Sequence, residues 1–163
     1  MIDIGANLTH DSFDKDRDNV IRDAQVVGVE TFIITGSDVA CSHKARDLAH
    51  QYAECCYATA GIHPHHASDF DGDVEDAIQE LLNDDKVVAV GETGLDYFRD
   101  FSPRAAQIFS FERHIKLAID NKMPLFLHQR ESHKDFYPIL KEHRDQLGNV
   151  VVHCFTDNEQ ALF

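Results

Sequence analysis

Ionisable side chains stand directly after four apolar segments of the chain. In chain order they are His63 and His65, then Glu92, then His128 with Arg130, and finally His153. A carboxylate and two imidazoles supply ligands suited to zinc, manganese or iron, and with added waters to magnesium. Three protein ligands leave coordination positions open for water and substrate. Glu92, His128 and His153 therefore predict a catalytic metal site rather than a structural one.

The segments before these side chains read as buried strands of a parallel sheet. The six candidate strands are Ile2 to Gly5, Thr31 to Thr35, Cys56 to Ala60, Val87 to Val90, Leu125 to His128 and Val150 to His153. Most are nearly continuous apolar runs, which is typical of parallel strands covered on both faces. Amphipathic stretches alternate with them, and this alternation predicts βα units. Such units build either a doubly wound sheet or part of a (β/α)8 barrel.

Helices are expected between the strands. Val74, Ala77, Ile78, Leu81 and Leu82 recur at helical spacing. Ser102 is the expected N-cap of a helix that runs to Asn121, with Pro103 at its first position. Further helices are expected from Phe13 to Gly28, from near Ser37 to Tyr52, and from Phe136 to Gly148, the last with a late start or a kink at Pro138.

The barrel alternative explains why the polar side chains follow the strands. The C-terminal ends of barrel strands meet at one mouth, so Glu92, His128 and His153 would face a common point there. Apart from His66, which stays open between a functional and a solvated role, the other histidines lie in predicted helices or their approaches and are interpreted as structural. They are His10, His43, His50, His114, His133 and His143.

Composition indicates an ordinary globular protein, expected to be one domain over residues 1–163. The chain is 43% hydrophobic and carries a net charge of -14, which argues against broad electrostatic attraction to nucleic acid. A nuclease remains compatible with this charge, because a metal site supplies positive charge locally. No apolar run is long enough for a membrane span, no export signal is visible, and the four cysteines do not suggest a disulfide framework. We therefore expect a soluble cytoplasmic protein.

Five motifs together resemble the TatD family of metal-dependent deoxyribonucleases, which belongs to the wider amidohydrolase-like barrel superfamily. The motifs are Asp3-Ile4-Gly5-Ala6-Asn7-Leu8-Thr9, Gly61-Ile62-His63-Pro64-His65, Gly91-Glu92-Thr93-Gly94-Leu95-Asp96, His128-Gln129-Arg130 and His153-Cys154-Phe155-Thr156. The likeness runs along essentially the whole chain. It implies a TIM (β/α)8 barrel, present here as an incomplete barrel of about six βα units.

The resemblance also implies a function and roles for the residues. It implies a 3′-5′ exonuclease that acts on single-stranded DNA, with RNA also possible, and that works with a divalent metal. Magnesium is the expected ion, with manganese or zinc as alternatives. Glu92, His128 and His153 match the family's metal ligands. His63 matches an active-site position near the scissile phosphate, Glu92 also counts as catalytic, and His65 and Arg130 are expected to bind substrate. No membrane and no obligate protein partner are implied.

Several alternatives stay open at this point. Asn7-Leu8-Thr9 replaces the His-x-His pair that most of the superfamily carries on the first strand. Asp96 either orients a metal ligand or fixes its loop. The family continues beyond the position of Phe163, so we expect the first and sixth strands to have open edges. The chain is then expected to be marginally stable, to associate through those edges, or to be a piece of a longer protein. The functional alternatives are an amidohydrolase that cuts C–N or ester bonds, and an inactive metal-binding fragment.

Overall fold

The computed structural model describes residues 1–162, which form one parallel sheet of six strands in the order of the chain. The strands are β1 (Ile2–Ala6), β2 (Thr31–Ile34), β3 (Cys56–Ala60), β4 (Val87–Asp96), β5 (Leu125–Arg130) and β6 (Val150–His153). The α-helices are α1 (Arg17–Val26), α2 (Val39–Gln51), α3 (Gly72–Leu81), α4 (Arg104–Asn121), α5 (His133–Glu142) and α6 (Glu159–Leu162), and two short 3-10 helices are η1 (Asp11–Phe13) and η2 (Pro64–Asp69).

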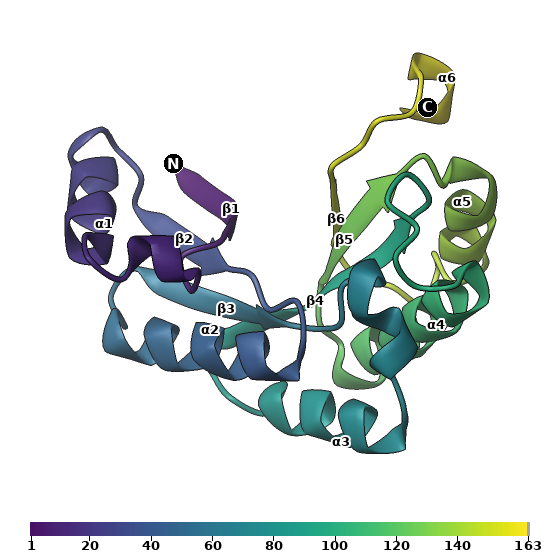
Figure 1. The fold of residues 1–163 in the computed structure, drawn as a ribbon, viewed down its shortest axis with the longest axis horizontal. Coiled ribbons are helices and arrows are strands. Elements are labelled where there is room, and N and C mark those ends of the chain that lie inside the picture. The colour runs from purple at the N-terminus through teal and green to yellow at the C-terminus, as the bar shows by residue number, and fades with distance from the viewer. Residues whose placement is uncertain (163) are drawn as a thin grey trace.

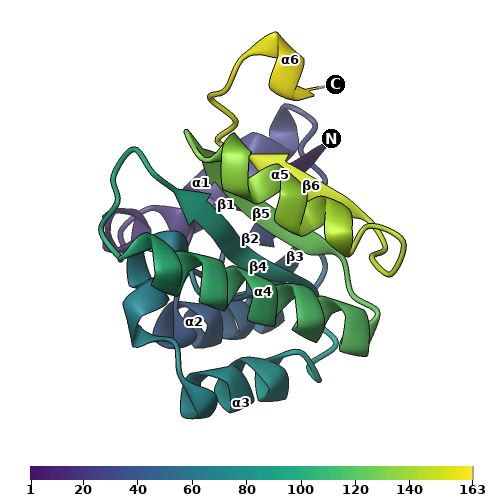
Figure 2. The same cartoon turned by 90° about the vertical axis from the view of Figure 1, so that its right-hand side faces the viewer.

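The sheet curls like part of a barrel, with helices along its outer side (Figure 1). After a 90° turn about the vertical axis, α4 and α5 lie in front of β4 and β5 (Figure 2). Each strand pairs in parallel with the next one along the chain, as successive βα units of a (β/α)8 barrel do. The predicted incomplete barrel is therefore confirmed.

The first and last strands border the open side of this sheet. In the part of the chain that the structure describes, β1 pairs only with β2, and β6 pairs only with β5. Ile2 and Ile4 on β1 are 57% and 45% exposed, and Val151 and Val152 on β6 are 40% and 37% exposed. Apolar side chains thus lie uncovered along both edges.

The core fills the space between the sheet and its helices. Its largest fully buried apolar side chains are Ile34, Ile78, Leu81, Leu95, Phe111, Ile115, Leu125 and Leu127. Two helices begin at aspartate caps: Asp38 accepts a hydrogen bond from the Cys41 N–H at 2.7 Å, and Asp71 accepts one from the Val74 N–H at 3.0 Å. These caps satisfy backbone donors that the first helical turn leaves free.

Several details differ from the prediction, among them the following four. β4 runs to Asp96 rather than ending at Val90. The expected first helix is split into η1 and α1. α4 begins at Arg104, because the hydroxyl of Ser102 does not cap it but donates to the His65 carbonyl at 3.0 Å. α5 begins early, at His133, and contains Pro138, whose fixed φ suits a helix although its missing N–H leaves one hydrogen bond unmade.

Of the helices that the structure describes, none has the length and apolar character needed to cross a membrane.

Candidate metal centre

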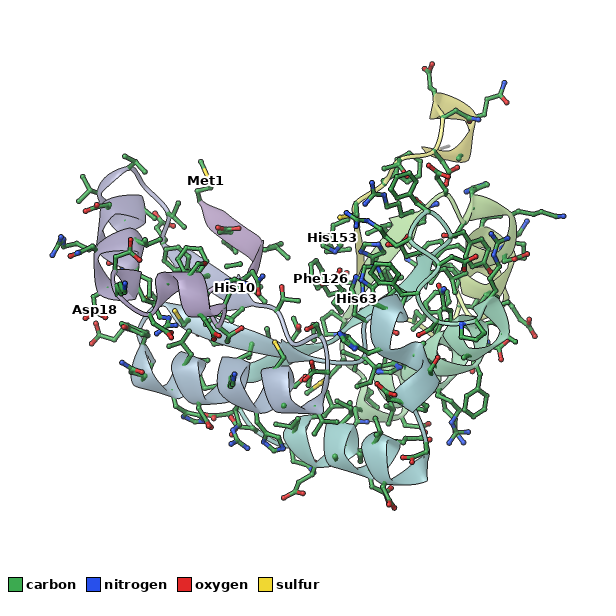
Figure 3. The ribbon with its side chains drawn as sticks, in the orientation of Figure 1. Met1, His10, Asp18, His63, Phe126 and His153 are labelled. Atoms are coloured by element: carbon green, nitrogen blue, oxygen red, sulfur yellow. The ribbon has the colours of Figure 1, made fainter. Side chains whose placement is uncertain are left out.

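Three histidine rings surround one oxygen of Glu92. Glu92 Oε1 lies 2.6 Å from His153 Nε2, 3.0 Å from His128 Nδ1 and 3.3 Å from His63 Nε2. The four side chains come from β4, β6, β5 and the segment after β3. Figure 3 shows His63 and His153 close together beside Phe126, on the inner side of the curled sheet. The convergence expected at the strand ends is thus present, and His63 is part of it.

Strand register brings the two predicted histidine ligands side by side. His128 on β5 pairs with His153 on β6, and Gly94 on β4 pairs with His128. Residues paired across a parallel sheet point to the same face, so both rings reach the barrel interior. Glu92 and His128 are buried, whereas His153 is only partly covered.

Two glycines allow β4 to pass close to β5 on either side of Glu92. A Cβ atom on Gly91 would lie 2.1 Å from the Phe126 carbonyl oxygen, and one on Gly94 would lie 2.1 Å from the His128 carbonyl oxygen. Both residues also have positive φ, 140° and 135°. Side chains at these positions would push the strands apart, which explains the Gly-x-x-Gly spacing around the carboxylate.

The proton on His63 is placed by its neighbours. Its Nδ1 accepts a hydrogen bond from the His65 N–H at 3.1 Å, so the neutral ring carries its proton on Nε2. That nitrogen faces the cluster, 3.2 Å from His128 Nδ1. Burial lowers the pKa of His63, although the nearby Glu92 carboxylate works against this. His63 therefore offers a hydrogen-bond donor rather than a lone pair, which distinguishes it from the expected metal ligands.

Glu92 is held as a carboxylate. Burial by itself would raise the pKa of Glu92, but hydrogen bonds from His128, His153 and His63 outweigh burial and hold the pKa well below its ordinary value. The site thus carries a negative oxygen at its centre. A carboxylate surrounded by nitrogen atoms matches the chemistry of a divalent-cation site.

Asp96 connects two histidines to the loop after β4. Its Oδ2 lies 2.9 Å from His65 Nε2 and 3.2 Å from His128 Nε2. Its Oδ1 accepts hydrogen bonds from the N–H groups of Phe98 and Arg99 at 3.1 and 2.8 Å. Burial would raise the pKa of Asp96, but these hydrogen bonds lower it. Asp96 therefore contacts His128, a predicted metal ligand, and also holds the loop after β4.

His65 and Arg130, the other predicted substrate residues, lie at the edge of the cluster. The rings of His65 and His63 meet edge to face with centroids 4.2 Å apart. The Arg130 guanidinium lies over the Phe98 ring, 4.1 Å from its centroid. Among the ion pairs within residues 1–162, none involves the Arg130 guanidinium, whose recorded contact is with the Phe98 ring.

The donor set fits a divalent cation. His128 presents one ring nitrogen to Glu92 while its other nitrogen faces Asp96, the arrangement in which a carboxylate fixes the tautomer of a ligating histidine. His153 adds a second imidazole at hydrogen-bonding distance from the same carboxylate oxygen. The ring nitrogens of His128 and His153 and the carboxylate of Glu92 already lie within hydrogen-bonding distance, so no apolar side chain separates the three potential ligands.

Two further groups of potential ligands occur among the described residues. Cys154 Sγ lies 3.9 Å from His153 Nδ1 and belongs to a group with His128 and His153. His50 forms a second group with Asp84 and Asp85, before the start of β4 and away from the strand C-termini. Arg46 lies 4.0 Å from Asp84, so this second group is an ion-pair network that already has a cation.

The sequence does not reveal that His114 helps to shape the site. His114 on α4 is fully buried, and its Nδ1 donates to the Ser110 carbonyl at 2.7 Å. Its Nε2 therefore accepts the N–H of Ile62, at 3.1 Å, and holds the chain just before His63. No pattern in the sequence reveals this contact. Asp96, by contrast, is a residue that the sequence does indicate, because it closes the Gly91–Asp96 motif four residues after Glu92.

The chain is similar to known proteins along nearly its whole length. The family described as TatD related DNase matches residues 2–163. A relative from Erwinia tasmaniensis, named 3′-5′ ssDNA/RNA exonuclease TatD, is 43% identical over 162 residues, which cover 99% of this chain and 62% of that protein. The chain therefore spans less than two thirds of the length of this relative.

Two solved structures have the same fold. A hydrolase TatD family protein from Entamoeba histolytica superposes with a TM-score of 0.90 at 31% identity, covering 99% of this chain and 60% of that one. A TatD homologue from Escherichia coli K12 superposes with a TM-score of 0.90 at 29% identity, covering 99% and 62%.

Proposed function

Because the chain belongs to the TatD related DNase family, we propose that the protein is a metal-dependent phosphodiesterase that removes nucleotides stepwise from the 3′ end of single-stranded DNA or RNA. The name of the Erwinia relative supports this substrate and this polarity. The observation that carries the proposal is the convergence of three imidazoles on one carboxylate oxygen. We further propose that residues 1–163 belong to one barrel domain that works in the cytoplasm, where the four free cysteines would remain reduced.

Glu92, His128 and His153 would hold the cation. Magnesium is the proposed working ion, with manganese or zinc as alternatives; two imidazoles favour manganese or zinc more than magnesium in terms of intrinsic affinity. When bound, such an ion polarises a phosphodiester oxygen and lowers the pKa of a coordinated water.

The protein's own residues would position the phosphodiester and manage its protons. His63 directs an N–H on Nε2 into the cluster, where it can donate to a phosphate oxygen or to the departing oxygen. Arg130 has no carboxylate partner within residues 1–162, so its guanidinium is available to pair with a phosphate. Asp96 keeps the His128 and His65 rings in place.

A nuclease assay tests the proposal. The protein is incubated with Mg²⁺ or Mn²⁺ and a 5′-labelled single-stranded oligonucleotide, and the expected product is a ladder that shortens from the 3′ end. Glu92→Ala and His128→Ala should each abolish metal-dependent cleavage. His50→Ala, in the separate His50–Asp84 network, is the matched control and should cleave normally.

Other outcomes point to the alternatives. Retention of cleavage in Glu92→Ala or His128→Ala would contradict the assignment. Hydrolysis of amides or lactones without cleavage of oligonucleotides would favour the amidohydrolase alternative. Metal binding without turnover of any substrate would favour an inactive metal-binding fragment.

A further inference from the structure

Two phenylalanines lie exposed in the loop that joins β4 to α4. Phe98 is 53% exposed and Phe101 is 66% exposed. Residues 97–101, here called the rim loop, arch beyond the end of β4, as Figure 2 shows. Because the Phe98 and Phe101 rings are exposed, they do not belong to the hydrophobic core. Exposed aromatic side chains beside a site indicate a binding surface.

The rim loop is held firmly although its rings are exposed. Asp96 Oδ1 accepts the N–H groups of Phe98 and Arg99, and the Tyr97 N–H donates to the Arg130 carbonyl at 3.0 Å. The Tyr97 hydroxyl also donates to Asp135 Oδ2 at 2.8 Å. A binding surface that is already ordered loses less conformational entropy when its ligand arrives.

Arginines lie against the aromatic rings of the rim loop. Arg130 lies 4.1 Å from the centroid of Phe98, and Arg104 lies 4.1 Å from that of Tyr97. Arg104 also pairs with Asp100 at 3.2 Å, whereas Arg130 has no such partner within the described residues. The chain as a whole carries a net charge of -14. The rim loop differs from this overall balance, because two guanidinium groups lie against its rings.

The rim loop is linked directly to the metal centre. Asp96 holds the loop through Oδ1 and contacts His128 through Oδ2. The ring of Phe101 packs against His65, with centroids 4.7 Å apart. A molecule stacked on Phe98 or Phe101 would therefore have its remaining atoms within reach of the histidine cluster.

We propose that Phe98 and Phe101 form a stacking platform for an unpaired nucleobase, with Arg130 binding the adjoining phosphate. Rings and arginines together are the usual means of holding single strands without reading their sequence, because every base has a stackable face. A paired base cannot lie flat on such a platform, so the platform selects for single strands. This inference rests on the proposed function and adds to it the feature that recognises unpaired bases.

The test compares binding of intact and abasic strands. Fluorescence anisotropy measures the affinity of the protein, with Mn²⁺, for a labelled single-stranded oligonucleotide whose 3′ phosphorothioate linkages slow cleavage. A second oligonucleotide lacks the bases at its 3′ end. The variants are Phe98→Ala, Phe101→Ala, and Phe98→Trp as the conservative change. Phe109→Ala is the matched control, because Phe109 is also 53% exposed but lies on α4 and contacts Phe70.

The expected loss for the intact strand is about tenfold for each alanine variant, with little change for the abasic strand. Phe98→Trp and the control should bind the intact strand as the unaltered protein does. Mn²⁺ affinity, measured by calorimetry, should be the same in all variants, which shows that the metal centre and the fold are intact.

Two results would overturn the proposal, and they are distinguishable. If the unaltered protein prefers the intact strand and the alanine variants keep that preference, the platform is wrong while the proposed function stands. If the unaltered protein binds Mn²⁺ but neither strand, the platform and the proposed nuclease function fail together.

Discussion

Among the single residues, Asp96 is not a predicted metal ligand, yet its carboxylate contacts two histidines of the site and the rim loop. One oxygen faces His65 and His128, and the other holds the rim loop. A histidine ligand needs its second nitrogen fixed if its first is to point at the cation. In the proposed site the carboxylate would therefore act on the metal through His128 and on substrate through the loop.

Replacing Asp96 by asparagine tests this role. We expect Asp96→Asn to weaken Mn²⁺ binding about tenfold or more, because the amide cannot accept the proton of His128 as strongly as a carboxylate does. Isothermal titration calorimetry measures the affinity, and circular dichroism checks the fold. Unchanged Mn²⁺ affinity in a folded Asp96→Asn protein would show that His128 does not depend on Asp96.

His114 predicts a pH dependence of stability. Burial lowers its pKa from the ordinary value of 6.5 to about 4, although the Ser110 carbonyl and the charge of Glu75 act in the opposite direction. The unfolded chain therefore binds a proton more readily than the folded chain between these two values. The stabilisation is complete above pH 6.5 and is lost as the pH falls toward 4, by on the order of 3 kcal/mol in total.

Urea unfolding at several pH values measures this effect. The free energy of unfolding of the unaltered chain should fall over this interval. His114→Gln keeps an acceptor for the Ile62 N–H but does not titrate, so its decline should be smaller by the His114 contribution. An identical decline in both proteins would mean that another group causes it.

At the scale of elements, β4 decides the shape of the site through its glycines. A Cβ on Gly94 would lie 2.1 Å from the backbone oxygen of His128, and backbone atoms cannot move aside cheaply. We expect Gly94→Ala to lower the free energy of unfolding by roughly 3 kcal/mol. Gly148→Ala is the control, since nothing lies within 4 Å of a Cβ there. Urea unfolding of the two variants should separate them; equal stability would contradict the proposed close approach of the strands.

β4 also shows what could be predicted from sequence and what could not. The apolar run Val87–Val90 predicts a strand, but the following residues contain two glycines and polar side chains, which lack the composition of a buried strand. The register shift between Val90 and Thr93 further hides the alternation. A predicted strand that ends at Val90 therefore gives no indication that Glu92 and Asp96 both contact His128.

The site could be predicted in part for a similar reason. Residue type and position after a strand were enough to select Glu92, His128 and His153, because parallel strands end at one mouth. The tautomer of His63 and the burial of His114 depend on contacts between residues far apart in sequence. The exposure of Phe98 and Phe101 likewise could not be read from their types, since phenylalanine is usually buried.

At the scale of the whole molecule, the uncovered edges should govern behaviour in solution. Apolar side chains lie along β1 and β6, and an unpaired strand edge is a template for association. We expect this chain to self-associate in a concentration-dependent way, measurable by sedimentation velocity. Val151→Lys, on β6, should reduce the association, whereas Val26→Lys, an equally apolar exposed site on α1, should not. Equal association of both variants would place the contact elsewhere.

We propose that Glu92, His128 and His153 together bind one divalent cation. Electron paramagnetic resonance of added Mn²⁺ tests it most directly, because bound manganese reports the nitrogen atoms that coordinate it. We expect bound Mn²⁺ to show hyperfine coupling to imidazole nitrogen, and this coupling should be reduced in His128→Ala and in His153→Ala. The affinity for Mn²⁺ should fall at least about tenfold in Glu92→Gln. Bound Mn²⁺ without nitrogen coupling, or with unchanged affinity in Glu92→Gln, would contradict it.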